Sequence, residues 1–330
     1  MLKKSLLCLL IMPYAFIAFG DEGIHVDIKE WKVPWDNTRP RDPFIGPRGL
    51  VWFVGQVGHY IASFNPENYE FKRYNLEEGT GPHNLIVAKD GTIWFAGNLK
   101  GYIGRLNRKT GENIKYVMPD PRARDPHTLV FDGKGHIWFT VQTGNFIGRL
   151  NTKSGKIDLI EVPTSHARPY GIVVDSNSRP WIAKFGSNKL ATIDPETLKI
   201  EEIELPRKDA RPRRLGITSD GHIWYVDYAK GYLGMYDPTT RGFKEWKAPS
   251  GNKSGPYGMA VDDSDRIWFV ETMQFPNNLV VFDSKTETIM DITPIPSGGG
   301  SIRHMYFNKP TREIWFGTDT NNIGRVVVPK

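Results

Sequence analysis

The chain has almost no cysteine. Among its 330 residues only Cys8 is present, and it lies within the first twenty. A mature chain without that segment has no thiol, which excludes disulfides, cysteine nucleophiles and thiolate metal sites. The sequence also has no Cys-x-x-Cys-His, no Gly-rich phosphate loop, no Gly-x-Ser-x-Gly elbow and no His-Glu-x-x-His helix. We therefore expect no haem, no nucleotide and no zinc.

Long hydrophobic runs and blocks of one charge are absent from most of the chain. The exception is residues 1–20, where two lysines precede an apolar stretch and a small-residue site, as in a secretory signal peptide. We expect this peptide to be removed, leaving residues 21–330 as one domain without a membrane span, periplasmic or secreted and monomeric. The net charge is only +6 and is dispersed, so nucleic acid is not an expected partner.

Tryptophan, in contrast, recurs at an almost fixed interval. The gaps between successive members of this series are 42 to 47 residues long. The series comprises Trp52, Trp94, Trp138, Trp181, Trp224, Trp268 and Trp315. A period in the low forties carried by short β-strands is typical of propeller blades. The sequence therefore predicts an all-β, seven-bladed β-propeller.

Each repeat contains the signals for four antiparallel strands. In residues 81–119 an apolar strand, an Asp-Gly turn and a strand with the tryptophan are followed by YIGRL and then ENIKYVMP. The last repeat ends after NNIGRV without a fourth strand, whereas residues 30–34, EWKVP, nearly repeat the outer strand EWKAP at 245–249. We expect the N-terminal segment to complete the last blade and close the ring. The tryptophans themselves are expected to pack between blades.

Two sets of equivalent positions are expected at one rim of the central channel, because the first strand of a blade starts where the second ends. The first set follows the Pro of each Gly/Arg/Asp-Pro motif: Arg48, His83, His127, Tyr170, Arg213, Tyr257 and Arg303, with Arg214 and His304 one residue further. The second set lies three residues past each tryptophan and includes Lys184, Asp227, Glu271 and Thr318, with Asp319 next to it.

The first set contains only arginine, histidine and tyrosine. A channel lining is polar by default, since water fills it, and this explanation remains open. A lining of donors and positive charge also suits an anionic or carbonyl-rich ligand, such as a small molecule, a peptide or a sugar acid. His83 and His127 lie on adjacent blades, where they are candidate acid/base or metal-binding groups.

The same positions contain the groups that a β-elimination requires. Tyr170 or Tyr257 is a candidate proton donor to a leaving oxygen, and Arg213 or Arg303 is a candidate partner for a carboxylate or enolate. Glu271 or Asp227 is a candidate to orient a base or hold a cation.

The repeats GPHNLIVAKDGTIWF with GYIGRL, and DPHTLVFDGKGHIWF with NFIGRL, resemble those of the streptogramin B lyases. That resemblance extends over residues 26–330 and implies a seven-bladed propeller that opens a cyclic depsipeptide by elimination, with Mg²⁺ and a histidine base. It implies the base at the position of Arg303, carboxylates at those of Ser301 and Asp319, and a substrate-contacting histidine at that of Tyr257. Only Asp319 keeps the chemical type, although a one-residue shift places His304 at the base position.

Three functions remain open from the sequence. The first is a lyase acting on an anionic or ester-bearing ligand at the Arg/His/Tyr rim, with Mg²⁺ as its cofactor. The second is a propeller that binds a ligand or a protein without catalysis. The third is a lactonase-like metal-dependent hydrolase, for which Asp227, Glu271 and Asp319 supply the only candidate carboxylates.

Overall fold

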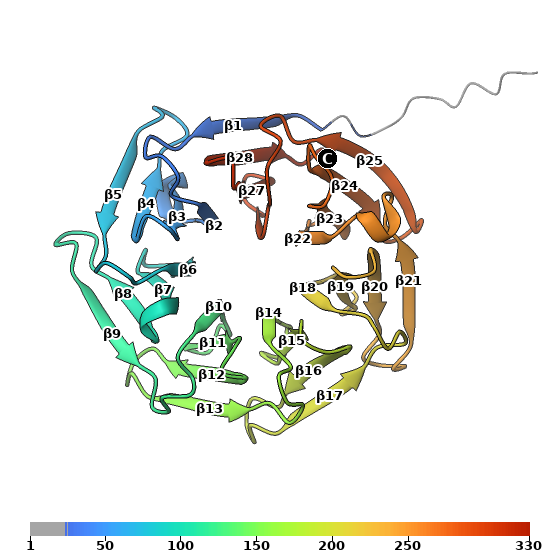
Figure 1. Ribbon diagram of the computed structural model, residues 1–330, viewed down its shortest axis with the longest axis horizontal. Helices are drawn as coiled ribbons and strands as arrows, with labels where there is room; N and C mark the ends of the chain where they lie inside the picture. The colour runs from blue at the N-terminus through green and yellow to red at the C-terminus, as the bar shows by residue number, and fades with distance from the viewer. Residues whose placement is uncertain (1–23, 25) are drawn as a thin grey trace, which may run out of the picture.

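The computed structural model describes residue 24 and residues 26–330, so the signal peptide predicted for residues 1–20 lies outside the described residues. The described chain forms seven four-stranded antiparallel sheets arranged as a ring (Figure 1). The predicted all-β, seven-bladed propeller is therefore confirmed. Its helical segments over these residues are three short 3-10 turns, η1 (Pro47–Gly49), η2 (Asn98–Lys100) and η3 (Gly251–Lys253), and no helix there has the length and apolarity to cross a membrane.

Six blades are continuous in the chain, and their strands run from the channel outward in sequence order. Blade 1 contains β2 (Pro40–Ile45), β3 (Val51–Gly55), β4 (Tyr60–Phe64) and β5 (Phe71–Asn75). Blade 2 contains β6 (Pro82–Val87), β7 (Ile93–Gly97), β8 (Tyr102–Leu106) and β9 (Asn113–Val117). Blade 3 contains β10 (Pro126–Phe131), β11 (His136–Val141), β12 (Phe146–Asn151) and β13 (Ile157–Glu161). Blade 4 contains β14 (Pro169–Val174), β15 (Pro180–Lys184), β16 (Lys189–Ile193) and β17 (Ile200–Glu204). Blade 5 contains β18 (Pro212–Ile217), β19 (Ile223–Asp227), β20 (Tyr232–Tyr236) and β21 (Phe243–Lys247). Blade 6 contains β22 (Pro256–Val261), β23 (Arg266–Glu271), β24 (Asn278–Asp283) and β25 (Thr288–Pro294).

The seventh blade joins the two ends of the described chain. It contains β26 (Met305–Asn308), β27 (Glu313–Gly317), β28 (Asn322–Val327) and, as its outer strand, β1 (Ile28–Lys32). β1 pairs with β28 from Ile28 opposite Val326 to Lys32 opposite Asn322. Trp31 of β1 stacks on Trp315 with ring centroids 5.6 Å apart. The predicted closure by the N-terminal strand is confirmed, and it removes the exposed edge that β28 would otherwise present.

The repeated tryptophans pack each blade against the next. All seven are buried, with at most 5% of their surface exposed. Trp52 of blade 1 lies in one core cluster with Leu85 of blade 2, and Trp315 of blade 7 lies in one with Phe53 of blade 1. The other five clusters follow the same rule around the ring. The tryptophans are therefore interblade packing residues, as the sequence predicted.

The inner strands of six blades share a β-bulge near their first residues. In β6 the pairing with β7 runs from Pro82 opposite Gly97 to Leu85 opposite Phe95, so one extra residue lies on β6. The same shift occurs in β2, β10, β14, β18 and β22. A bulge interrupts the strict alternation of side chains. Two consecutive residues after each proline can therefore take part in contacts at the channel.

Candidate functional site

With the exception of Arg48, the two predicted sets of residues lie at one rim of the propeller. Pro82 at the start of β6 is opposite Gly97 at the end of β7, and Pro256 of β22 is opposite Glu271 of β23. The inner strands β2, β6, β10, β14, β18 and β22 surround the axis in Figure 1. The residues after the prolines of six blades therefore meet at the axis, and Arg303, which follows Ile302 just before β26, is the matching residue of blade 7. We call them the inner ring: Arg41, His83, His127, Tyr170, Arg213, Tyr257 and Arg303.

Histidine and tyrosine side chains of the inner ring are stacked next to one another. The His83 and His127 rings lie 3.5 Å apart, and those of His127 and Tyr170 lie 4.1 Å apart, measured between centroids. The Tyr170 hydroxyl shares a short hydrogen bond with the hydroxyl of Tyr257. Because Tyr170 belongs to blade 4 and Tyr257 to blade 6, this contact joins two blades that are not neighbours.

Arg213 lies in an aromatic cage formed by Tyr170, Phe185, Tyr228 and Tyr257. Its guanidinium carbon is 3.6 Å from the ring centroid of Tyr257, 4.2 Å from that of Tyr228 and 4.4 Å from that of Phe185. Contacts of this kind stabilise a cation without neutralising it. Arg213 therefore keeps its full charge for a ligand, and its side chain is only partly buried.

A buried ion-pair network crosses the axis below the rim. Asp42 accepts a hydrogen bond of 3.0 Å from Nε of Arg41 and one of 2.9 Å from the amide of Asn84. One Asp42 oxygen lies 3.6 Å from Nη2 of Arg214, which comes from the opposite side of the ring. Arg214 also donates to Thr128 Oγ1 and to the backbone oxygen of Arg303. The network thus joins blades 1, 2, 3, 5 and 7.

Several buried polar atoms of this cluster have no hydrogen-bond partner among the described residues. They are Arg41 Nη2, His83 Nδ1, His127 Nε2, Arg213 Nε, Arg214 Nη2 and His304 Nδ1. Buried polar groups in proteins are normally paired, and each exception needs an explanation. Six such atoms from five different blades, gathered around one axis, indicate a polar binding site. A cavity of about 360 Å³ lies beyond the inner ring along the channel and reaches Arg214 and His304.

The charges around the site change how its side chains ionise. Burial, together with the guanidinium groups of Arg41 and Arg214, lowers the pKa of His83 and His127 well below the usual range. Burial also lowers the pKa of His304 to about 3, although Asp42 acts in the opposite direction. The three imidazoles are therefore neutral at physiological pH. Four arginines remain charged nearby, and among the residues that the structure describes Asp42 is the only carboxylate buried with them.

The two hydrogen-bonded tyrosines have pKa values that move in opposite directions. Burial opposes ionisation of Tyr170, but Arg213, Arg214 and Arg41 outweigh it, so the pKa of Tyr170 lies below its usual value. Burial and the neighbouring Tyr170 raise the pKa of Tyr257. Such a pair, with one group inclined to ionise and its partner inclined to stay protonated, is the arrangement that separates a general base from a general acid.

The stability of the protein is expected to fall when the pH drops from 7 to 4. The buried His83, His127 and His304 have folded-state pKa values below the unfolded value, so the unfolded chain binds more protons in this range. The midpoint of thermal unfolding, measured at several pH values, should decrease with acidification. The variant His304→Gln should show a shallower decrease, and an equal slope in both proteins would contradict the assignment.

The predicted position of Arg48 is wrong. Arg48 lies in η1, in the connection between β2 and β3, and therefore at the rim opposite the inner ring. The residue of blade 1 that matches His83 is Arg41, because Pro40 pairs with Gly55 as Pro82 pairs with Gly97. The Gly-Pro-Arg motif at residues 46–48 resembles the true motif, Arg-Pro-Arg at 39–41. Sequence reasoning therefore missed both Arg41 and Asp42.

The acidic residues of the second set face the loops of their own blades. Glu271 accepts hydrogen bonds of 2.7 Å from the backbone nitrogen and the hydroxyl of Ser250. Asp227 accepts from Arg207 and from the backbone nitrogen of Arg211. Lys184, the basic member of the second set, pairs with Glu202 of β17 in its own blade. These side chains hold the loops that enter each blade, and the structure does not bring them together with the inner ring.

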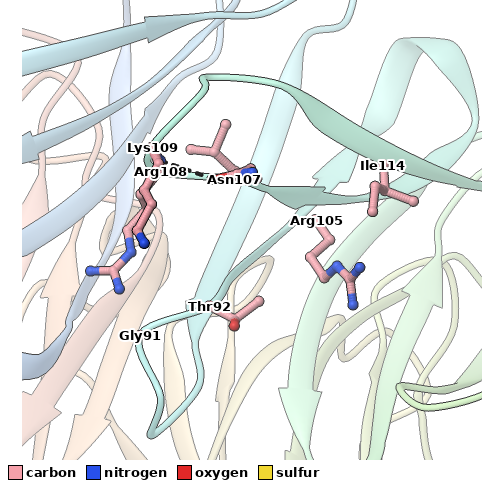
Figure 2. Close-up of a pocket in the computed structure, with 8 residues that line it drawn as sticks. Gly91, Thr92, Arg105, Asn107, Arg108, Lys109 and Ile114 are labelled. Carbon is pink, nitrogen blue, oxygen red and sulfur yellow. Dashed lines mark hydrogen bonds between the residues drawn. The ribbon is translucent and has the colours of Figure 1, made fainter.

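Another pocket lies at the opposite rim, in blade 2. It measures about 300 Å³, and Figure 2 shows its lining around the turns at Gly91 and at Arg108, with Arg105 and Ile114 on the strands. None of the predicted site residues lines it. The gathering of buried unpaired atoms therefore makes the inner ring, and not this pocket, the candidate site.

Comparisons with known proteins place this geometry in a family. The model of the virginiamycin B lyase family matches residues 22–277. This chain belongs to the virginiamycin B lyase family.

Solved structures agree with that assignment. A virginiamycin B lyase from Staphylococcus aureus is 25% identical, with a TM-score of 0.83, and the match covers 92% of this chain and all of that one. A catalytically inactive histidine-to-alanine variant of that enzyme, solved with quinupristin, aligns equally well. YCF48 bound to the D1 peptide is 13% identical, with a TM-score of 0.70 over 92% of this chain and 95% of that one, and shares the fold alone. The search of curated proteins found no match.

The virginiamycin B lyase resemblance implied a base at Arg303, and the structure shows what that residue does. Arg303 donates to Asp319, which also lies 3.8 Å from Nε of Arg39. A guanidinium carries no accessible lone pair and remains protonated, so Arg303 is suited to bind an anion and not to remove a proton. His304 follows it, but its pKa of about 3 and its position beside Arg214 and Asp42 place it inside the network.

The carboxylates considered for Mg²⁺ are far from forming a common site. Asp227, Glu271 and Asp319 belong to three blades, and each already accepts bonds from protein donors. Over residue 24 and residues 26–330, no three His, Cys, Asp or Glu side chains gather as metal ligands. Mg²⁺ requires several oxygen ligands in octahedral geometry. These residues do not fit that requirement.

Proposed function

We propose that this protein binds a carboxylate-bearing ligand at the inner ring and cleaves a carbon–oxygen bond in it by β-elimination. The observation that carries the proposal is the Tyr170–Tyr257 pair, hydrogen-bonded to each other and surrounded by Arg213, Arg214 and Arg41. The signal peptide predicted at residues 1–20 adds a periplasmic or secreted location to the proposal.

The arginines bind and activate the ligand. Arg213, held by the aromatic cage, and Arg303, at the rim, bind the carboxylate. Neutralising that carboxylate lowers the barrier to removing a proton from the adjacent carbon, since negative charge develops on it in the transition state. The unpaired buried atoms Nε of Arg213 and Nη2 of Arg214 are suitable donors for this charge.

The tyrosines move the protons. Tyr170, as a phenolate, removes the proton from the carbon next to the carboxylate. The electron pair forms a carbon–carbon double bond, the bond to the β-oxygen breaks, and Tyr257 donates its proton to that oxygen. Afterwards Tyr170 is protonated and Tyr257 is not, and the hydrogen bond between their hydroxyls allows the proton to return. His127 lies beside Tyr170 and His83 lies beside His127, and both neutral imidazoles can accept hydrogen bonds from the ligand.

An absorbance assay tests the elimination. Its product contains a carbon–carbon double bond conjugated with the carboxylate of a uronate, or with the neighbouring amide carbonyl of a depsipeptide, and either product absorbs at the ultraviolet edge. Incubating the purified protein with 4-linked polygalacturonate or with a cyclic depsipeptide should produce this absorbance with one of the two. If both stay unchanged while hydrolysis products without the double bond appear, the elimination proposal fails.

A second candidate is binding without catalysis. Arg303 occupies the position at which the family resemblance implies the base, and it is paired with Asp319. If a ligand raises the temperature of unfolding but is recovered unchanged, this second function is supported.

A further inference from the structure

The rim outside the inner ring carries arginines that the proposed elimination does not use. Arg39, Arg168 and Arg211 come directly before Pro40, Pro169 and Pro212, on blades 1, 4 and 5. Arg39 and Arg168 are exposed, and Arg211 is partly exposed. Arg168 forms no ion pair or side-chain hydrogen bond with any residue that the structure describes. The Arg168 guanidinium is therefore available to a ligand, whereas Arg211 donates to backbone oxygens of its own loop and Arg39 lies beside Asp319.

Two of these arginines adopt a backbone conformation that favours glycine. The φ angle is 50° at Arg39 and 49° at Arg168, and the matching residues of blades 2 and 6 are Gly81 at 51° and Gly255 at 54°. A side chain in this left-handed region costs about 1 kcal/mol relative to glycine. Strain of this kind is concentrated at functional sites. The presence of arginine at two positions suited to glycine is thus a first indication that these side chains have a functional role.

The arginines are arranged along a line across the rim. Arg168 and Arg211 precede β14 and β18, which lie across the axis from β2 and β27 in Figure 1. On the far side Arg39 and Arg303 converge on the single carboxylate of Asp319, which leaves one positive charge in excess. Arg213 contacts Tyr170 of blade 4 and Tyr257 of blade 6, on the inner side of Arg211. Three positively charged positions therefore follow one another from blade 4 to the junction of blades 7 and 1.

The blades on either side of this line present apolar groups. A Cβ atom on Gly81 would lie 2.6 Å from the side chain of Leu99, and one on Gly255 would lie 2.4 Å from that of Met273. Leu99 is 68% exposed and Met273 is 51% exposed. Apolar side chains thus occupy the rim at blades 2 and 6. The line of positive charge is bordered on both sides, as expected for an elongated ligand.

We infer that the ligand is an acidic oligosaccharide of 4-linked uronate units that lies along this line with at least three units bound. The inference rests on the proposed elimination and names its substrate class. In such a chain every unit carries a carboxylate, and the glycosidic oxygen lies β to the carbon that the carboxylate acidifies. The central unit is bound by Arg213, which Phe185 and Tyr228 hold in place, and the outer units are bound by Arg168 and by Arg39 with Arg303.

Isothermal titration calorimetry with galacturonic acid and its 4-linked dimer and trimer tests this inference. Titrations use the Tyr170→Phe background, so that bound oligomer is not consumed. Affinity should rise from the monomer to the trimer. Arg168→Gln should weaken trimer binding about three- to fivefold, as expected for one exposed ionic contact, without changing monomer binding. Arg122→Gln is the matched control, since Arg122 lies in a loop of the same rim but is paired with Asp120 and Glu161.

Several results would overturn the inference. A trimer that binds no more tightly than the monomer, or no binding of either, contradicts a three-unit site. An aspartate peptide of equal charge that binds as tightly, with the same loss in Arg168→Gln, contradicts the saccharide assignment. A failure of the elimination proposal alone gives a different result. Affinity then still rises with the number of uronate units, but the unsubstituted protein releases no product with a carbon–carbon double bond. If instead that protein produces the double bond and Arg168→Gln has no effect on oligomers, the elimination stands and the extended site fails.

Discussion

Replacing Tyr170 with phenylalanine should reduce the rate of elimination about 10²- to 10⁴-fold, the range for loss of a general base. The substitution removes one oxygen atom and keeps the ring that packs on His127 and borders Arg213. Ligand binding through the arginines should therefore remain within a fewfold of its original strength. Initial rates of double-bond formation and the dissociation constant, measured on the same preparation, separate the two effects.

The pH dependence of the unsubstituted protein provides a second readout for Tyr170. The rate should rise with pH, because the base acts in its deprotonated form, and it should level off below the pH at which an ordinary phenol ionises, because the arginines lower the pKa of Tyr170. Tyr102→Phe serves as a control, since Tyr102 lies in blade 2 and its hydroxyl contacts Thr80. A Tyr170→Phe protein with an undiminished rate would exclude Tyr170 as the base.

Deleting the chain through Pro34 should remove most of the stability of the propeller. The deletion removes β1 and with it the whole pairing with β28 and the stacking of Trp31 on Trp315. It also exposes Trp315 and Phe64, which Trp31 covers. Trp31 is half-buried, and the deletion removes its packing together with the whole strand pairing, whereas a domain is stable by only about 5–15 kcal/mol. Urea unfolding monitored by tryptophan fluorescence should show a much lower midpoint, or no cooperative transition.

The exposed residues of β1 supply the control for the deletion. Lys29→Ala and Lys32→Ala keep the strand and its pairing, so their unfolding midpoints should stay close to that of the full chain. A deleted protein with an unchanged midpoint would show that closure by β1 is dispensable for the ring.

Much of the fold could be predicted because the propeller repeats one unit. Each tryptophan occupies the same place in the packing between two blades, so the interval between Trp52 and Trp315 directly reports the number of blades. The closing strand was recognisable because EWKVP repeats an outer strand. The position of His83, His127, Tyr170, Arg213 and Tyr257 at one rim follows from the antiparallel order of strands alone.

The contacts within the site were less predictable for three physical reasons. The Gly-Pro-Arg turn at Arg48 imitates the motif that precedes the inner ring, so Arg41 and Asp42 were missed. The β-bulge in six of the inner strands allows two consecutive residues to contribute, which a strict alternation does not anticipate. The directions of Asp227 and Glu271 depend on loops whose donors, such as Ser250, have no repeated sequence signal.

The pairing of β1 with β28 also has a consequence for the order in which the protein folds. Ile28 and Val326 are almost at opposite ends of the chain, yet they are partners in one strand pair. Blades 1 to 6 are each complete in a contiguous stretch and can form as soon as that stretch is available. The pairing of β1, in contrast, can form only after β28 is available, and contacts this distant in sequence form slowly. Closure of the ring is thus expected to be the final step of folding, and until it occurs the growing protein carries two open sheet edges.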